Sequence, residues 1–219
     1  MAAEGDDTTV VDAGTVDAPP PENAVAQAAA VLRAGGVVAL PTDTVYGLAA
    51  LPGVDGATAE LFALKGRAAD VPLAVLCASP EQALGLAEPR AVTAEVRRLA
   101  ARLWPGPLTL VLPRRAGLGF ALGEPSGTIG VRCPDHALVR ALAGAVGPLA
   151  TTSANHHGEP TPTTADGVAA VFRGRVPLVL DGGPCAAPPS SVVDATTRDW
   201  RLLRAGALGM AEVDVAARP

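Results

Sequence analysis

Residues 37–47 read VVALPTDTVYG, and this stretch decides how the chain is expected to fold. Residues 37–40 form a short apolar run that contains β-branched side chains and ends at Pro41, which predicts a buried strand. Residues 42–47 are polar and interrupt the apolar pattern where that strand ends. Because ligands of open α/β sheets sit where strands end, we expect residues 42–47 to face a ligand.

Short apolar runs alternate with helical patterns on both sides of this stretch. We expect helices at residues 22–34, 57–64, 93–103, 137–145 and 163–172. We expect further strands at residues 73–76, 108–112, 128–132, 149–152, 178–180, 192–193 and 201–204. Strands that alternate with helices predict an α/β fold with a mixed sheet. We expect one domain over residues 22–210, between tails at residues 1–21 and 211–219.

The composition indicates a globular protein with few aromatic side chains. Hydrophobic residues make up 49% of the 219 residues and aromatic residues 3%, so Ala, Val and Leu are expected to form the core. No apolar run reaches the roughly 18 residues that a membrane span needs, and residues 1–22 lack the pattern of a signal peptide. We therefore expect a cytoplasmic protein. Its three cysteines are expected to be buried thiols rather than disulfides or zinc ligands.

The charge is distributed unevenly along the sequence. Residues 1–22 carry six acidic and no basic residues, whereas the remainder carries 17 basic and 16 acidic residues. We expect residues 1–21 to be a disordered acidic tail ahead of a near-neutral domain. Since no basic stripe is interleaved with aromatic residues, a broad nucleic-acid-binding surface is not expected.

Lysine is used once, at Lys65, among 17 basic residues. Two interpretations are open: a chance survivor in an arginine-rich composition, or a site that needs a compact ammonium against a crowded phosphate. Arg67 lies two residues further on, so two cations can face one ligand from the end of a helix.

Common catalytic and nucleotide-binding motifs are absent from the sequence. Lys65 is not part of a GxxxxGK[ST] loop, and Ser153 lacks the GxSxG context of a nucleophile. His156 and His157 are adjacent, and we expect a solvated pair rather than metal ligands. Thr163 follows a proline and precedes an acid by three residues, a pattern typical of a helix N-cap, where backbone N–H groups offer a phosphate site.

Several segments resemble the signature motifs of the YrdC family. These segments are residues 41–48 (PTDTVYGL), 64–67 (LKGR), 103–109 (LWPGPLT), 130–132 (GVR), 134–136 (PDH), 152–155 (TSAN), 158–160 (GEP) and 181–185 (DGGPC). The resemblance extends from about residue 22 to residue 208. It implies a short, single YrdC-like domain, in which a twisted mixed sheet with flanking helices surrounds a positively charged cavity.

The resemblance also implies a function, that of a nucleotidyltransferase. The family joins L-threonine, bicarbonate or CO₂, and ATP into L-threonylcarbamoyl-AMP and pyrophosphate, and a partner complex uses the product to modify an adenosine beside the tRNA anticodon. Motif matching implies catalytic roles for Lys65, Arg67, Ser153 and Asn155. It implies ATP contacts from Lys65, Arg67, Thr128, Asn155, Thr163 and Arg204. It implies threonine contacts from Thr44, Arg132, Ser153 and Ser190.

The chemistry implied by the resemblance needs positioning and charge neutralisation more than a covalent nucleophile. Mg²⁺ is expected to enter with the ATP phosphates, since no dedicated carboxylate cage is visible in the sequence. Further implied partners are the tRNA threonylcarbamoyl-transferase complex, through transient contact, and RNA. No membrane partner is expected.

Three positions depart from the family pattern. Leu76 stands where some members carry a histidine, so a threonine contact is expected to be lost or replaced. Residues 190–192 read SSV instead of STV, and Ala205 replaces a proline after Arg204.

Two other functions remain open on the sequence. A related domain forms carbamoyl-AMP inside longer carbamoyltransferase chains that often carry cysteine-rich zinc motifs, whereas this sequence has 219 residues and three cysteines. A double-stranded RNA-binding module is the other alternative, and the near-neutral domain argues against it as the main role.

Overall fold

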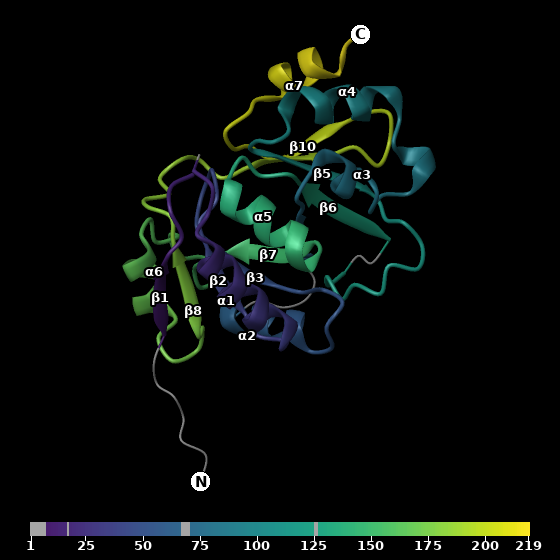
Figure 1. Ribbon diagram of the computed structural model, residues 1–219. Helices are drawn as coiled ribbons and strands as arrows, with labels where there is room; N and C mark the ends of the chain where they lie inside the picture. The colour runs from purple at the N-terminus through teal and green to yellow at the C-terminus, as the bar shows by residue number, and fades with distance from the viewer. Residues whose placement is uncertain (1–7, 17, 67–70, 125–126) are drawn as a thin grey trace.

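In the part of the chain that the structure describes, ten strands form one mixed sheet (Figure 1). The computed structural model describes residues 8–16, 18–66, 71–124 and 127–219. Along the sheet the order is β1-β8-β2-β3-β7-β4-β6-β5-β9-β10. The strands are β1 (Thr9–Asp12), β2 (Val38–Leu40), β3 (Gly47–Ala50), β4 (Ala74–Leu76), β5 (Leu108–Pro113), β6 (Thr128–Arg132), β7 (Leu149–Ser153), β8 (Leu178–Asp181), β9 (Ser191–Asp194) and β10 (Arg201–Arg204).

Parallel and antiparallel pairs occur in the same sheet, which confirms the predicted mixed α/β fold. β8 runs parallel to both β1 and β2, and the pairs β4–β6 and β5–β9 are also parallel. The pairs β2–β3, β3–β7, β4–β7, β5–β6 and β9–β10 are antiparallel. Strands distant in sequence therefore lie side by side in the middle of the sheet.

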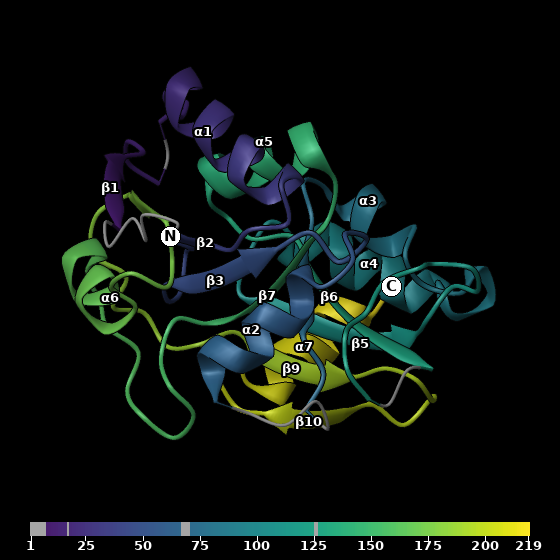
Figure 2. The same cartoon turned by 90° about the horizontal axis from the view of Figure 1, so that it is seen from below.

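Seven α-helices and one short 3₁₀-helix cover this sheet in the described part of the chain. They are α1 (Glu22–Arg33), α2 (Ala57–Lys65), α3 (Pro80–Leu84), the 3₁₀-helix (Pro89–Ala91), α4 (Ala94–Leu103), α5 (Ala137–Val146), α6 (Ala165–Val171) and α7 (Met210–Ala217). Helices α1 and α5 pack side by side, as both views show (Figures 1 and 2), and α4 packs against α7 (Figure 1). Among the described helices, none is long and apolar enough to cross a bilayer.

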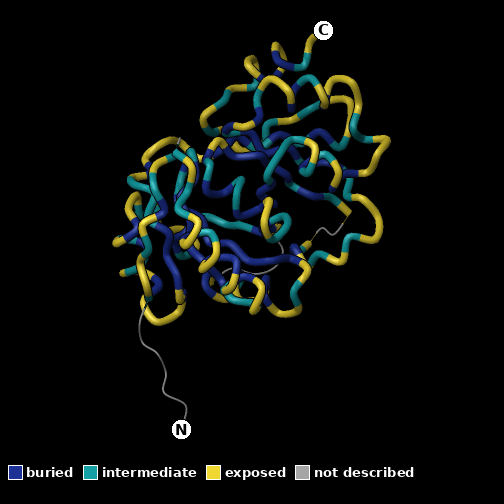
Figure 3. Tube along the Cα trace, viewed as in Figure 1, coloured by how far each residue is buried: buried dark blue, intermediate teal, exposed yellow. Residues whose placement is uncertain are grey.

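Two apolar clusters bury the inner positions of the strands and helices (Figure 3). The smaller cluster packs α1 and α5 against β2 and β8, with Leu32, Leu138 and Leu142 fully buried. The larger cluster includes Leu48, Val75, Leu110 and Val131 and packs beneath α2 and α4. A fully buried Leu or Val side chain stabilises a fold by about 1.5–3 kcal/mol, so these clusters hold the sheet in place.

The expectation of a disordered tail through residue 21 is wrong for residues 9–12. These residues form β1, which pairs with β8 in continuous register from Thr9–Leu178 to Asp12–Asp181, and Ala13 is fully buried behind it. The acidic composition of this segment indicated a tail. The local sequence also does not reveal the pairing with β8, which lies about 170 residues further along the chain. Residues 1–7 and 17 lie outside the described residues.

The segment predicted to be a C-terminal tail contains a helix. α7 packs against α4, burying Val213 and Ala216, and the Arg98 and Arg102 side chains donate hydrogen bonds to carbonyl oxygens at its C-terminal end. Those guanidinium groups satisfy acceptors that a helix end leaves without intrahelical partners. Residues 210–217 thus belong to the folded body.

Candidate active site

A cavity of about 430 Å³ opens on one face of the sheet. Alternate side chains of a β-strand point to the same face of the sheet, so every second residue of a strand can contribute to the floor of the cavity. On β6, Thr128, Ile129, Gly130 and Arg132 line the cavity, whereas Val131 is fully buried in the larger apolar cluster and is not part of the lining. On β5, Thr109 lies on the cavity side between core leucines.

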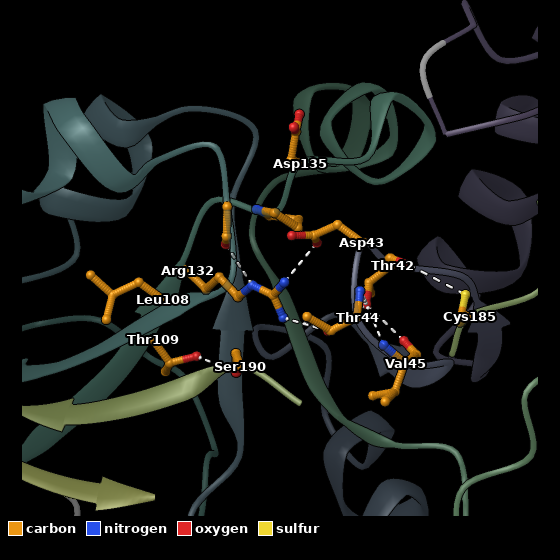
Figure 4. A network of polar contacts seen from close by, with 12 residues as sticks. Thr42, Asp43, Thr44, Val45, Leu108, Thr109, Arg132, Asp135, Cys185 and Ser190 are labelled. Carbon is orange, nitrogen blue, oxygen red and sulfur yellow. Dashed lines mark hydrogen bonds and ion pairs between the residues drawn. The ribbon is translucent and has the colours of Figure 1, made fainter. Parts of the chain in front are cut away.

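The Arg132 guanidinium is fixed at one end of the cavity by three protein acceptors (Figure 4). Its Nη2 forms an ion pair with Asp43 Oδ1 at 2.6 Å, Nη1 donates to Thr44 Oγ1 at 3.0 Å, and Nε donates to the Gly106 carbonyl at 3.0 Å. The Arg132 side chain is 5% exposed. Burial lowers the pKa of Arg132, and the Asp43 carboxylate opposes that shift. These bonds leave at most one N–H on each terminal nitrogen for a ligand.

The polar residues 42–47 form a rigid connection between β2 and β3. Thr42 Oγ1 accepts from the backbone N–H groups of Thr44 and Val45 and donates to the Val45 carbonyl at 2.7 Å. Thr42 Oγ1 also lies 3.0 Å from Thr44 Oγ1, and either hydroxyl can be the donor in that contact. Thr44 Oγ1 accepts the hydrogen bond from Arg132 Nη1. Tyr46 donates to the Gly183 carbonyl, and the Cys185 thiol donates to the Thr42 carbonyl, which ties the connection to the segment after β8.

Lys65 lies at the C-terminal end of α2, where the helix dipole favours a cation. Its ammonium donates to the carbonyl of Ser153 at 3.0 Å, to Ser153 Oγ at 2.8 Å and to Asn155 Oδ1. Thr161, which lines the cavity, also donates to Asn155 Oδ1 at 3.1 Å. One ammonium therefore joins the end of α2 to the turn after β7.

A second guanidinium lines the cavity on the β10 side. Arg204 Nη2 donates to Ser190 Oγ at 2.9 Å, and both Nε and Nη2 donate to the Ser190 carbonyl. Ser190 Oγ also shares a hydrogen bond of 3.0 Å with Thr109 Oγ1. Burial lowers the pKa of Arg204, and the nearby Arg132 charge lowers it further. The Ser190 and Thr109 hydroxyls carry one proton each, and the hydrogen bond between them uses only one of these protons. The other proton can be donated to a different acceptor.

The described lining of the cavity suits an anionic ligand. Its charged side chains are the two guanidinium groups of Arg132 and Arg204, and most of its other polar side chains are hydroxyls. Guanidinium groups bind carboxylate and phosphate oxygens through paired hydrogen bonds. Within the described residues, no group of three or more His, Cys, Asp or Glu side chains could hold a metal ion.

A family model described as "Telomere recombination", the Sua5/YciO/YrdC domain, matches residues 30–206. The chain belongs to the Sua5/YciO/YrdC family. This result confirms the resemblance to the YrdC family and the single YrdC-like α/β domain.

Members of the Sua5/YciO/YrdC family from distant organisms share substantial identity with this chain. A relative from Pyrococcus abyssi (strain GE5 / Orsay) named threonylcarbamoyl-AMP synthase is 40% identical over 189 residues, which are 85% of this chain and 55% of that protein. A chain from Mycobacterium leprae (strain TN) is 38% identical over 190 residues, covering 86% of each. The present chain thus spans just over half of the P. abyssi relative.

A solved structure of the family has the same fold. The crystal structure of P. abyssi Sua5 complexed with L-threonine superposes with a TM-score of 0.87 at 37% identity, over 95% of this chain and 61% of that one.

The fold gathers most of the site residues that the family resemblance implied. Lys65 and Asn155 bond to each other beside the cavity, and Ser153 both accepts from Lys65 and lines the cavity. Arg67 lies outside the described residues. The implied residues that line the cavity are Thr44, Thr128, Arg132, Ser153, Ser190 and Arg204.

Thr163 is placed differently from the sequence expectation. The N-cap of α6 is Thr164, whose Oγ1 accepts from the backbone N–H of Gly167 at 3.2 Å, so the expectation of an N-cap at Thr163 is wrong by one residue. Thr163 is exposed and is not part of the described lining, and its carbonyl accepts from the Cys185 N–H at 2.8 Å. Two consecutive threonines before the helix made the pattern ambiguous. A contact from Thr163 to ATP stays a prediction.

Sequence reasoning missed two residues of this Sua5/YciO/YrdC site. Asp43 neutralises Arg132, and Thr109 extends the hydroxyl pair with Ser190. Both residues stand inside family motifs, but no periodicity reveals which distant side chain each one meets. Leu76, at the position that departs from the family pattern, is buried and lines the cavity.

The cysteines behave as predicted in the described part of the chain. Cys77, Cys133 and Cys185 are free and buried. Burial raises the pKa of Cys133 to about 11 and also raises the pKa values of Cys77 and Cys185.

Proposed function

We propose that this chain forms L-threonylcarbamoyl-AMP and pyrophosphate from L-threonine, bicarbonate or CO₂, and ATP. The observation that carries the proposal is the cavity itself, with Arg132 at one end, Arg204 at another, and the Lys65–Ser153–Asn155 cluster beside it. Support also comes from the names of relatives, including the P. abyssi threonylcarbamoyl-AMP synthase and the Sua5 structure that contains L-threonine.

Arg132 is proposed to hold the substrate carboxylate. Its remaining N–H bonds lie on the two terminal nitrogens, which suits the two oxygens of a carboxylate. Thr44 keeps the guanidinium oriented toward the cavity, and Ser190 supplies a hydroxyl from the other side. These contacts would place the amine of threonine in the cavity.

The reaction then needs two bond changes. The neutral amine adds to bicarbonate or CO₂ and gives a carbamate, with water released when bicarbonate reacts. A carbamate oxygen attacks the α-phosphorus of ATP, the bond from that phosphorus to the bridging oxygen breaks, and pyrophosphate leaves. Positioning and charge stabilisation supply most of the catalysis in such a transfer.

Lys65 and Arg204 are proposed to stabilise the charge that develops on the phosphates, together with Arg67. One cation about 4 Å from a phosphate contributes roughly 4 kcal/mol at an effective dielectric near 20. Asn155 and Ser153 fix the position of the Lys65 ammonium, and Thr128 is proposed to contact the nucleotide. Mg²⁺ is proposed to arrive bound to the ATP phosphates.

The test is product formation by the purified protein. The protein is incubated with ATP, bicarbonate and L-threonine, and mass spectrometry follows threonylcarbamoyl-AMP while a coupled assay follows pyrophosphate. Product that requires all three substrates supports the proposal. Product formed with carbamoyl phosphate in place of threonine and bicarbonate would instead identify a carbamoyl-adenylate-forming enzyme. Binding of double-stranded RNA without either product would favour an RNA-binding module.

A further inference from the structure

The middle of the cavity floor has no side chain, because Gly130 occupies it. Gly130 lies on β6 between Thr128 and Arg132 and lines the cavity with them. Each of these neighbours is two residues away, about 6.6 Å along a strand. On the adjoining strands the residues paired with Gly130 are Ala74 and Val111.

The fold does not require glycine at this position. The pairing of β6 is regular on both sides, from Ala74–Gly130 to Leu76–Arg132 and from Val111–Gly130 to Pro113–Thr128, so Gly130 does not form a bulge. Its φ angle lies outside the left-handed region. A Cβ built at Gly130 would lie 3.6 Å from Thr109 Cγ2 and 3.9 Å from both Ala74 Cα and Val111 Cγ2, which are ordinary packing distances.

Other glycines near the site have structural reasons that Gly130 lacks. A Cβ at Gly47 would meet Thr151 Oγ1 at 3.0 Å and the Thr152 carbonyl at 3.3 Å. A Cβ at Gly106 would meet the Leu103 carbonyl oxygen at 2.5 Å. Glycine inside a strand weakens the strand and often marks a place where a ligand approaches the backbone closely. The remaining reason for a glycine at position 130 is therefore the space that a ligand bound in the cavity needs.

We propose that Gly130 determines specificity by leaving room for the junction between the amino-acid and nucleotide halves of the ligand. This inference rests on the proposed function, in which Arg132 holds the threonine carboxylate and Thr128 contacts the nucleotide. A ligand that joins these two contacts must cross the floor at Gly130. The carbamoyl–phosphate link, which is the only covalent connection between the halves, lies there against bare backbone.

The experiment compares Gly130→Ala with Gly119→Ala. Gly119 is exposed, lies outside the cavity lining and has no left-handed φ, and a Cβ added to it would meet no atom within 4 Å, so it is a matched control. Three properties are measured for each protein: substrate binding, by calorimetry with L-threonine alone and with ATP alone; the formation of threonylcarbamoyl-AMP; and the melting temperature.

Gly130→Ala should bind each substrate alone within about threefold of the wild type, yet form product at least about 30-fold more slowly, because a methyl group displaces the reacting junction. Its melting temperature should stay level or rise, because alanine lowers the entropy of the unfolded chain and suits a strand better than glycine. Gly119→Ala should leave all three properties near wild type. The added methyl group would then interfere only with a ligand that contains both the amino-acid half and the nucleotide half.

Other results overturn the inference. Product formation by Gly130→Ala within threefold of the control would show that the space is unused. Loss of binding of one substrate alone would place that substrate, rather than the junction, over Gly130, and a lower melting temperature would indicate a packing role. Absence of product from the wild type would refute the proposed function together with this inference, whereas an active wild type with an equally active Gly130→Ala variant refutes the inference alone.

Discussion

Removing the carboxylate of Asp43 should destabilise the protein more than removing any exposed acidic partner. The ion pair between Asp43 and Arg132 spans 2.6 Å, with side-chain exposures of 13% and 5%. Asp43→Ala leaves a buried guanidinium without its counter-charge, a change that typically costs 3–5 kcal/mol. Because Asp43 retains some exposure, we expect about 3 kcal/mol, the lower end of that range. For a chain of this size the melting temperature should fall by about 6–12 °C.

The chain supplies its own control in the ion pair between Asp135 and Arg140. That pair spans 2.8 Å, but its carboxylate is 60% exposed and its guanidinium 31%. Exposed ion pairs contribute at most about 1 kcal/mol, so Asp135→Ala should lower the melting temperature by no more than about 4 °C. Thermal and urea unfolding of both variants, at matched pH and salt, measures the difference.

A double variant separates the ion pair from other effects of the substitution. Replacing both partners of a buried pair with apolar residues is often neutral, so adding Arg132→Met to Asp43→Ala should recover at least half of the lost stability. Equal losses for Asp43→Ala and Asp135→Ala would refute the reasoning. A double variant less stable than Asp43→Ala alone would refute it as well.

Three further outcomes are expected. Lys65→Arg should lower the rate of threonine-dependent pyrophosphate release by at least about 100-fold, since a planar fork cannot occupy the position of an ammonium with three close acceptors; near-normal turnover would contradict this. Gly206→Ala should lower the melting temperature, because a Cβ there would overlap the carbonyl oxygen of Pro189, whereas Gly119→Ala should not. Cys77 and Cys133 should react with iodoacetamide at pH 8 far more slowly in the native protein than in urea, followed by mass spectrometry, because their raised pKa values leave almost no thiolate at that pH.

The strands that could be predicted from the sequence are those with strong local signals. Residues 128–132, which include Ile129 and Val131, predict a strand, and the structure has a strand with those bounds. By contrast β3, residues 47–50, reads GLAA, and small residues carry little strand preference. It forms a strand because β2 and β7 flank it on both sides. Strand β1 reads TVVD and has β-branched residues that favour a strand, but the six acidic residues among residues 1–22 indicated a tail, and the pairing with β8 is not encoded locally.

The candidate site could be predicted in its residue types but not in its contacts. Motif resemblance indicates Lys65, Ser153 and Asn155, and the structure brings these three together. It does not indicate that Asp43 neutralises Arg132, because the two residues are 89 positions apart in the sequence. Contacts over such separations depend on the order of strands in the sheet, which local patterns do not encode.

The order of the strands also determines when the cavity can exist during synthesis. Its lining begins at Thr42 and ends at Arg204 on β10, the last strand of the sheet. At 5–20 residues per second, a ribosome needs about 10–40 s to reach that arginine. Between the synthesis of β5 and that of β9, the nascent chain has β5 without its parallel neighbour and Thr109 without its partner Ser190. The complete lining of the cavity can therefore form only after β10 has emerged from the ribosome, and ligand binding should report that the strands from β2 to β10 have assembled.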